Sequence, residues 1–513
     1  MALTTRRVLT TAIGALALCV VASACSAGSD SGSDGSTGGT KSTKTTATFG
    51  FTAAPENLDF TTTDGAAIPQ VLLDNVYQGL VTLSPAGKIV GSLAKSWTVS
   101  PDNKTYDFQL QSDATFSNGD KFTADDVKFS IERVKSAAWK ISLKSYLDVV
   151  SQVQVVSPTE VKVVLAKPSN DWLFRMTTRV GAMFDPKAVT DLANKAIGTG
   201  PYTVSQFNRN DSVVLSARSD YWGAKPKVKT VKFQYFSDTN AENSALLSGG
   251  IDGIIALQTP DTLAQFTSKA DLSVVQGTTN GEVVLSMNNA GGAFTNKALR
   301  QAVTYAIDRK ALLKAVYDGY GSLIGSMVPP SDPWYQDLSN AYPYDPAKAK
   351  ALIAQSGQKN PKVAFKIPNL PYAVSAAQVV KSDLAKVGIT ANISVLQFPA
   401  AWLDQVFTKH TFDMSIIAHV EARDIATYGD KTYYWGYDNP AVTKLLAAGD
   451  AGTPQQQVTD YQQVAKTLSD DAVSDWLFLM PNLEVLKKGL NGVPRNALSE
   501  SFDVSAVSWG SGS

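Results

Sequence analysis

The chain has 513 residues, which is too long for one ordinary domain and predicts two or three lobes. Lysine plus arginine equals aspartate plus glutamate, at 46 each, so no excess of positive charge favours nucleic-acid binding. We therefore expect no nucleic-acid partner.

Residues 1–24 have the pattern of an export signal. Arg6 and Arg7 precede a largely apolar segment, residues 8–21, that is too short to span a membrane. The sequence Ala22-Ser23-Ala24-Cys25 resembles a lipobox, with alanine at the position usually held by leucine. We expect Cys25 to be acylated. An ordinary cleavage site is the alternative, and both the general secretory and the twin-arginine routes stay open.

Cleavage before Cys25 leaves 44 basic against 46 acidic groups and a single cysteine, so no intrachain disulfide is expected. Residues 25–46 are then a lipidated cysteine and a flexible tether, because Gly, Ser, Thr and Lys cannot build a core. The sequence predicts an extracytoplasmic body held on the outer face of the cell membrane.

The stretch 91–134 is a compact unit. Alternating apolar residues on both sides of the turn at Ser100-Pro101-Asp102-Asn103 predict a hairpin. Thr123 followed by Asp125 and Asp126 predicts a capped helix that begins there.

The rest of the body alternates strands and helices, which favours an α/β fold. Further strands are expected at 48–51, 153–156, 161–165, 228–236, 283–287, 389–396, 414–418 and 475–480. Further helices are expected at 66–80, 241–248, 296–316, 346–355, 375–387, 440–448 and 455–468.

Several motifs are far more specific than these patterns. They are LAKSW (93–97), SPDNKTYDFQL (100–110), ATFSNGDKFTADDVKFSIERV (114–134), GTGPY (198–202), LLSGGIDGI (246–254), LRQAVTYAIDRKALL (299–313) and YDPAKAKALIAQSG (344–357). In wording and order they resemble the family 5 solute-binding proteins of peptide and nickel ABC importers, over about residues 48–500.

This resemblance implies a periplasmic-binding-protein-like fold of type II, with two large lobes joined by a two-strand hinge and a smaller inserted lobe. Lobe I is expected at 47–90, 197–285 and 480–513, the small lobe at 91–196, and lobe II at 286–479. The implied partners are a peptide or other small ligand, a membrane permease and its ATPase. We expect a monomer without cofactor or resident metal.

The stretch 412–439 is the most informative about a site. A predicted buried strand ends at His419, and Glu421, Arg423 and Asp424 follow it. Polar residues at the end of such a strand are usual site positions in α/β folds. Tyr434 and Trp435 come next and add an aromatic wall suited to a cationic or zwitterionic ligand.

The family resemblance sharpens the site prediction. Relatives carry a W-x-x-D type segment here, whose acid holds the amino group of a bound peptide. His419 stands near the tryptophan position, and Glu421 or Asp424 near the acid. Asn57 matches a segment that runs along the ligand cleft, and Asn288 ends the predicted hinge strand at 283–287.

Other interpretations stay open. Glu421, Arg423 and Asp424 would also fit a local ion-pair cluster. The aromatic residues would also fit a packed surface loop, and His419 would also fit a nickel ligand. The sequence has neither HExxH nor GxSxG, so a secreted hydrolase has little support. A surface lipoprotein that senses a solute is the other alternative to an importer component.

Overall fold

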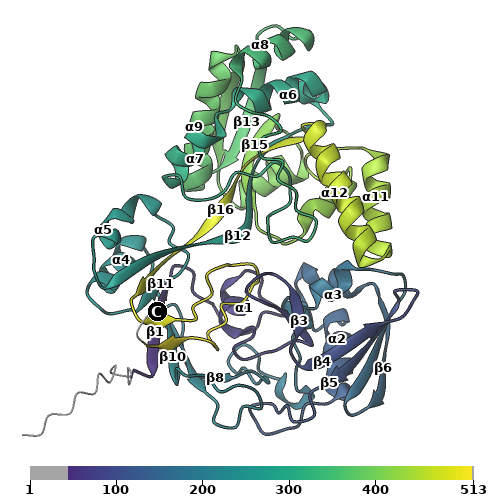
Figure 1. Cartoon of the computed structure of the whole chain (residues 1–513), viewed down its shortest axis with the longest axis vertical. Helices are drawn as coiled ribbons and strands as arrows, with labels where there is room; N and C mark the ends of the chain where they lie inside the picture. The colour runs from purple at the N-terminus through teal and green to yellow at the C-terminus, as the bar shows by residue number, and fades with distance from the viewer. Residues whose placement is uncertain (1–43, 511–513) are drawn as a thin grey trace, which may run out of the picture. The chain divides into compact units, whose positions relative to one another are not determined.

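The computed structural model describes residues 44–510, so the predicted signal, Cys25 and nearly all of the predicted tether lie outside this range (Figure 1). No helix in this range is long and apolar enough to cross a bilayer. The α-helices are α1 (Ala67–Leu72), α2 (Ala124–Lys135), α3 (Asp171–Arg175), α4 (Thr239–Leu247), α5 (Ala264–Thr267), α6 (Lys297–Ala306), α7 (Arg309–Tyr317), α8 (Pro346–Gln355), α9 (Pro371–Lys386), α10 (Ala400–Trp402), α11 (Pro440–Ala451) and α12 (Pro454–Asp470).

The strands form one large sheet and three smaller ones. They are β1 (Thr46–Phe51), β2 (Val81–Leu83), β3 (Ile89–Gly91), β4 (Ala94–Val99), β5 (Thr105–Leu110), β6 (Val150–Ser157), β7 (Glu160–Leu165), β8 (Tyr202–Asn208), β9 (Ser212–Ala217), β10 (Thr230–Tyr235), β11 (Gly253–Ile254), β12 (Leu272–Met287), β13 (Lys362–Pro368), β14 (Thr390–Leu396), β15 (Met414–His419), β16 (Ser474–Lys487), β17 (Leu490–Asn491) and β18 (Ser508–Trp509). The large sheet has the order β14-β13-β15-β12-β16-β11-β1-β10-β9-β8.

The long strands β12 and β16 connect the two halves of the large sheet. Residues 272–278 of β12 pair with 481–487 of β16 beside β11, and residues 282–286 pair with 474–479 beside β15. The register shifts between these two stretches. Figure 1 shows the pair running from the lower half of the body into the upper half. This is the two-strand connection between large lobes that was expected.

In lobe I, strand β1 is central and parallel to both β10 and β11. Its inner face carries Phe49 and Phe51, and Phe502 from the C-terminal segment packs edge-on against both, at 5.2 and 5.4 Å between ring centroids. Burying these rings ties the end of the chain back onto its first strand.

The small lobe contains the antiparallel sheet β4-β5-β7-β6, with α2 beside it. Trp97 lies opposite Phe108, and Val99 opposite Tyr106, which confirms the predicted hairpin. Helix α2 begins after Thr123, whose backbone N–H donates to the Asp126 carboxylate at 2.7 Å. The helix start predicted at this threonine is therefore correct.

Lobe II differs from the prediction at the helix expected for residues 296–316, and it contains a strand, β13, that was not predicted. The apolar stripe at 299–316 predicted one continuous helix, but the structure has α6 and α7, separated at Ile307 and Asp308. The Asp308 side chain caps α7 by accepting from the Ala311 N–H at 3.0 Å, and its own N–H donates to Asp383 at 3.1 Å. The chain bends here because local capping and a tertiary partner outweigh the helical periodicity.

The predicted helix at 66–80 is also too long, since α1 ends at Leu72. The buried Asn75 side chain donates to the Phe502 carbonyl and accepts from the Val504 N–H, which holds the C-terminal segment. Gly200 lies so close to the Asn75 carbonyl that an added Cβ would approach it to 2.4 Å. The GTGPY motif therefore provides close backbone packing.

Candidate ligand-binding site

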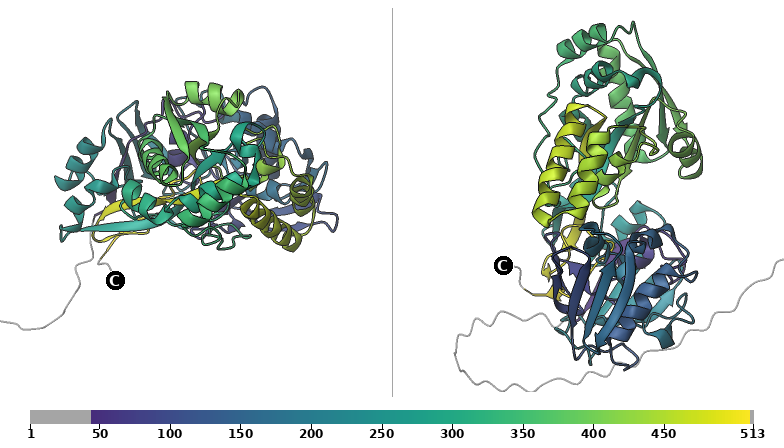
Figure 2. Two further views of the ribbon diagram at one scale, coloured as in Figure 1. Left: turned by 90° about the horizontal axis from the view of Figure 1, so that it is seen from above. Right: turned by 90° about the vertical axis from the view of Figure 1, so that its right-hand side faces the viewer.

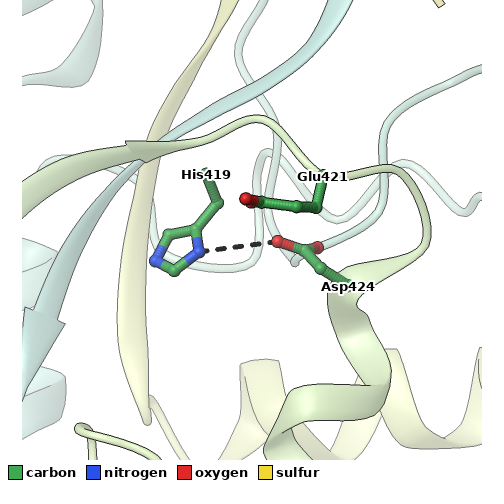
Figure 3. Close-up of side chains that lie close together, drawn as sticks. All are labelled: His419, Glu421 and Asp424. Carbon is green, nitrogen blue, oxygen red and sulfur yellow. Dashed lines mark ion pairs between the residues drawn. The ribbon is translucent and has the colours of Figure 1, made fainter. Parts of the chain in front are cut away.

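The site is built where β15 ends. Strand β15 pairs antiparallel with β12, which places His419 opposite Glu282. Arg423 has φ of 62°, a left-handed conformation that reverses the chain after the strand. The reversal brings Asp424 back toward His419, and the Glu421 side chain lies beside this pair (Figure 3).

His419 is buried, and both of its ring nitrogens face polar groups. Its Nδ1 lies 3.5 Å from Asp424 Oδ2, and its Nε2 lies 2.9 Å from the Tyr434 hydroxyl. That hydroxyl lies 2.5 Å from Ser286 Oγ, which extends the chain of polar contacts to β12. Burial lowers the pKa of His419 to about 4, so the imidazole is neutral at pH 7.

Two buried carboxylates in the site lack hydrogen-bond partners. Neither oxygen of Asp424 has a partner, and Oε2 of Glu282 has none, although the residues are only 7% and 1% exposed. Burial raises the pKa of each well above its usual value. The negative charges of nearby acids add to that shift, from Asp424 and Asp332 for Glu282 and from Glu421 and Asp332 for Asp424. Such a site favours a positively charged partner.

A third acid, Asp332, adds negative charge. Desolvation by burial raises the pKa of Asp332 to about 7, and Arg423 partly offsets this. Glu421 is the exposed member of the group, and Oε2 of Glu421 accepts from the Val420 N–H at 3.3 Å. The acidic group therefore extends from a buried position to the surface.

Arg423 points away from its neighbouring acids. Its guanidinium lies 3.9 Å from the centre of the Phe174 ring and 5.1 Å from that of Trp334. Among residues 44–510, no ion pair joins Arg423 to Glu421 or Asp424. The alternative of a local ion-pair cluster is wrong, because the arginine stacks on aromatic rings instead.

The aromatic residues after the acids are interior. Tyr434 and Trp435 are fully buried, and Trp435 stacks on Tyr428 with ring centroids 4.0 Å apart and planes 9° from parallel. Tyr433 packs against Trp435 at 4.4 Å. These rings form one wall beside His419, whose ring centroid is 5.3 Å from that of Trp435. They are not the surface loop considered as an alternative.

Residues from the small lobe complete one side. Phe174 belongs to α3, and Arg175 of α3 lies over the Tyr146 ring at 4.2 Å while pairing with Asp171 at 2.6 Å. The Phe174–Arg423 contact therefore joins the small lobe to lobe II beside the acidic group.

The profile of the bacterial extracellular solute-binding proteins, family 5, matches residues 88–444. The chain belongs to this family. Its members are the solute-binding components of ABC importers for peptides, glutathione or nickel, and they act outside the cytoplasm as transport proteins and not as enzymes.

Similar proteins support the same assignment. The glutathione-binding protein GsiB of Salmonella paratyphi A is 29% identical over 350 residues, which are 66% of this chain and 68% of GsiB. Among solved structures, CtaP of Listeria monocytogenes has a TM-score of 0.81 at 22% identity, covering 91% of this chain and 99% of CtaP. NikA of Brucella suis, solved with Fe(III)-EDTA, has a TM-score of 0.80 at 21% identity, covering 91% of this chain and 100% of NikA. The predicted two-lobe fold with a smaller inserted lobe is confirmed.

Two predicted ligand contacts of this family 5 protein lie elsewhere. Asn57 hydrogen-bonds within its own turn, donating to Thr63 and accepting from the Asp59 N–H. Asn288 is buried and donates to the carbonyls of His410 and Phe412. The structure brings together the other six predicted residues: His419, Glu421, Arg423, Asp424, Tyr434 and Trp435.

Glu282, Asp332 and Phe174 also lie at this site but were not predicted from the sequence. Glu282 is the single charged residue within β12, in an otherwise apolar or neutral strand, and that was an available signal. Asp332 and Phe174 come from a loop and a short helix far away in sequence, and nothing in their local patterns points to this site.

Proposed function

We propose that this protein is a lipid-anchored, extracytoplasmic receptor that captures a peptide or similar small polar solute between its lobes. It then delivers the solute to a membrane permease driven by an ATPase. The observation that carries the proposal is the buried group of unpartnered carboxylates at the end of β15, beside a small-lobe contact. Membership of family 5 supplies the importer context.

The chemistry of the site favours a ligand with a positive group. Asp424 and Glu282 offer unpaired carboxyl oxygens, and His419 is neutral. A positively charged ligand group would favour the ionised form of these acids, whose pKa values burial raises. The Helicobacter pylori neighbour DppA was solved with a peptide STSA, at a TM-score of 0.72 and 21% identity. A peptide with a free amine would place its ammonium against these oxygens.

Closure of the lobes around the solute is the proposed mechanism. A ligand that contacts both lobes stabilises the closed form, so binding shifts the population toward it. Contacts between α11 and the small lobe suit this role: Asn170 donates to the carbonyls of Gly449 and Gly452, at 3.0 and 2.8 Å. The right-hand view of Figure 2 shows α11 and α12 ending above the small lobe.

Ligand capture is tested with the purified protein. Native mass spectrometry identifies the solute that co-purifies with the protein. X-ray scattering then measures whether the protein becomes more compact when this solute or a peptide library is added. Glu421→Gln and Asp424→Asn should weaken a ligand with a free amine far more than its N-acetylated form. Asp438→Asn is the matched control, because the side chain of Asp438 is 63% exposed. No compaction with any solute contradicts capture.

Anchoring is tested separately through Cys25. Cys25→Ser should release the protein from membranes and abolish labelling by a radioactive fatty acid. A parent protein that carries no fatty acid would contradict the anchor and leave solute capture unaffected.

A further inference from the structure

The acids of the site outnumber the cations beside them. Asp332 faces Arg423, whose positive charge partly offsets the burial of this acid. Among residues 44–510, no lysine or arginine forms an ion pair with Glu282, Glu421 or Asp424. The site therefore has three acids that the cations of the described chain leave unpaired.

Glu282 is the most isolated of these acids. It is 1% exposed, and its Oε2 has no hydrogen-bond partner. It lies directly opposite His419 in the β12–β15 pairing, so the two side chains are on the same face of the sheet. The charged side chains that act most strongly on Glu282 are all acidic: Asp424, Asp332 and Glu421. A positive partner is what this side chain lacks.

One ammonium group does not satisfy two buried acids. The amine of a peptide bound at Asp424 supplies a single positive charge, and Glu282 then keeps its unpartnered oxygen in the interior. A buried carboxyl group without a partner costs stability whether it is ionised or protonated. A second positive group on the ligand removes this cost.

The surroundings suit a guanidinium as the second group. Beside His419, the ring of Trp435 lies 5.3 Å away between centroids, and Tyr433 packs on Trp435 at 4.4 Å. A planar guanidinium stacks on such rings, and it is more weakly hydrated than an ammonium, so burying it costs less. The protein uses the same chemistry nearby, where the Arg423 guanidinium lies 3.9 Å from the centre of the Phe174 ring.

We propose that Glu282 selects a ligand with a second positive group, close to the amine that Asp424 and Glu421 bind. A short peptide that begins with arginine has both groups on one residue, and a small diamine such as agmatine has both without a peptide bond. The inference rests on the proposed function and specifies its ligand as a dication. Glu282 of the connecting strand β12 is then a specificity-determining residue.

The test compares three ligands by calorimetry with the full purified protein. Arginyl-alanine and citrullyl-alanine have nearly the same shape, but citrulline has a neutral urea group in place of the guanidinium. The parent should bind arginyl-alanine at least ~10-fold more tightly, because a hydrogen bond to a charged group is worth at least that factor. Agmatine distinguishes the two sources: affinity equal to that of arginyl-alanine indicates a free diamine, and weaker binding indicates a peptide.

Glu282→Gln should reduce the ratio of the two dipeptide affinities to about 1 and bind citrullyl-alanine as the parent does. Glu484→Gln is the matched control, because it makes the same change at a glutamate that is 0% exposed and lies in the lower half of β16. This control should keep the ratio of the parent. The comparison in the parent needs no variant, so it tests the inference even if Glu282→Gln folds poorly.

Proton release gives a second readout. Because burial raises the pKa of Glu282, part of the ligand-free protein holds a proton there, and pairing with a cation drives that proton off. Calorimetry at pH 6 in two buffers of different ionisation enthalpy counts the protons released. Arginyl-alanine should release more protons than citrullyl-alanine from the parent, and as many as citrullyl-alanine from Glu282→Gln. A purely structural role of Glu282 would leave the two dipeptides equal in the parent as well.

The outcomes separate this inference from the proposed function. Equal affinity of the parent for the two dipeptides, an unchanged ratio in Glu282→Gln, or no binding of any of the three ligands at millimolar concentration overturns the inference. If the dipeptides bind equally and Asp424→Asn weakens both, capture of a single amine stands and the second group fails. If the ratio depends on Glu282 but no ligand compacts the protein, the dication site stands and capture by closure fails.

Discussion

Asp450 at the end of α11 is the residue through which the contact between lobe II and the small lobe can be tested. Its Oδ1 accepts from the Ser169 hydroxyl and from the Asp171 N–H, each at 3.0 Å. Asp450→Ala removes both bonds but keeps the backbone bond from the Asn170 N–H to the Asp450 carbonyl. The substitution therefore weakens the contact without removing it.

The size of the effect follows from these bonds. A hydrogen bond to a charged group contributes about 1.5–3 kcal/mol, and the lower value applies here because Asp450 is only half-buried. Allowing for water that replaces the lost partners, we expect the closed form to lose about 2 kcal/mol, a factor of about 30 in the closure equilibrium. If the ligand-free protein is mainly open, the ligand affinity falls by the same factor.

Calorimetry with the co-purified solute measures the affinity, and X-ray scattering measures the ligand concentration needed for compaction. Both should shift about 30-fold in Asp450→Ala. Asp438→Ala, an exposed change just before α11, should shift neither. Unchanged affinity in Asp450→Ala would refute the reasoning that the α11 contact belongs to the ligand-bound form.

Three further changes test the interior. Burial raises the pKa of Glu484 in β16 to about 8 from 4.5, so ionisation destabilises the folded state as pH rises through this window, by on the order of 5 kcal/mol at most. The melting temperature of Glu484→Gln should equal that of the parent below pH 4.5 and exceed it at pH 9. Identical melting temperatures of the two proteins at every pH would contradict this. Arg218 is 6% exposed and donates to the carbonyls of Thr115 and Phe116. Arg218→Met leaves both carbonyls without this charged donor and should cost about 3 kcal/mol in urea unfolding. An unchanged urea midpoint would rule that out. Tyr434→Phe leaves His419 and Ser286 without their shared partner and should cost about 1–3 kcal/mol, measured by thermal unfolding against the parent. Equal stability would show that the hydroxyl contributes nothing.

Local signals located many elements well. Asp345 and Pro346 predicted a helix start, and α8 begins at Pro346 with the Asp345 side chain accepting from the Lys348 N–H. The hairpin before and after Asn103 and the helix after Thr123 follow the same rule, because turns and caps are decided by a few neighbouring residues. The order of the motifs along the chain was enough to predict the family.

Competition with distant partners produced the errors. Periodicity predicted one helix through Ile307, but Asp308 caps a new helix and its N–H is held by Asp383, 75 positions away. Periodicity also predicted that the first helix continues past Leu72. In the structure the helix ends there, and Asn75 hydrogen-bonds to the C-terminal segment. A hydrophobic stripe reports burial, and it does not report which buried polar group will interrupt the helix.

The sequence alone determined the family and the fold class and singled out the segment of the candidate site, because motif wording and a strand ending in His419, followed by Glu421 and Asp424, are both local properties. Only the tertiary structure decided which groups face one another. The β12–β15 register placed Glu282 beside His419, and packing against the small lobe drew Arg423 onto Phe174 and away from its neighbouring acids. Such pairings depend on contacts between residues more than 100 positions apart, which no local pattern encodes.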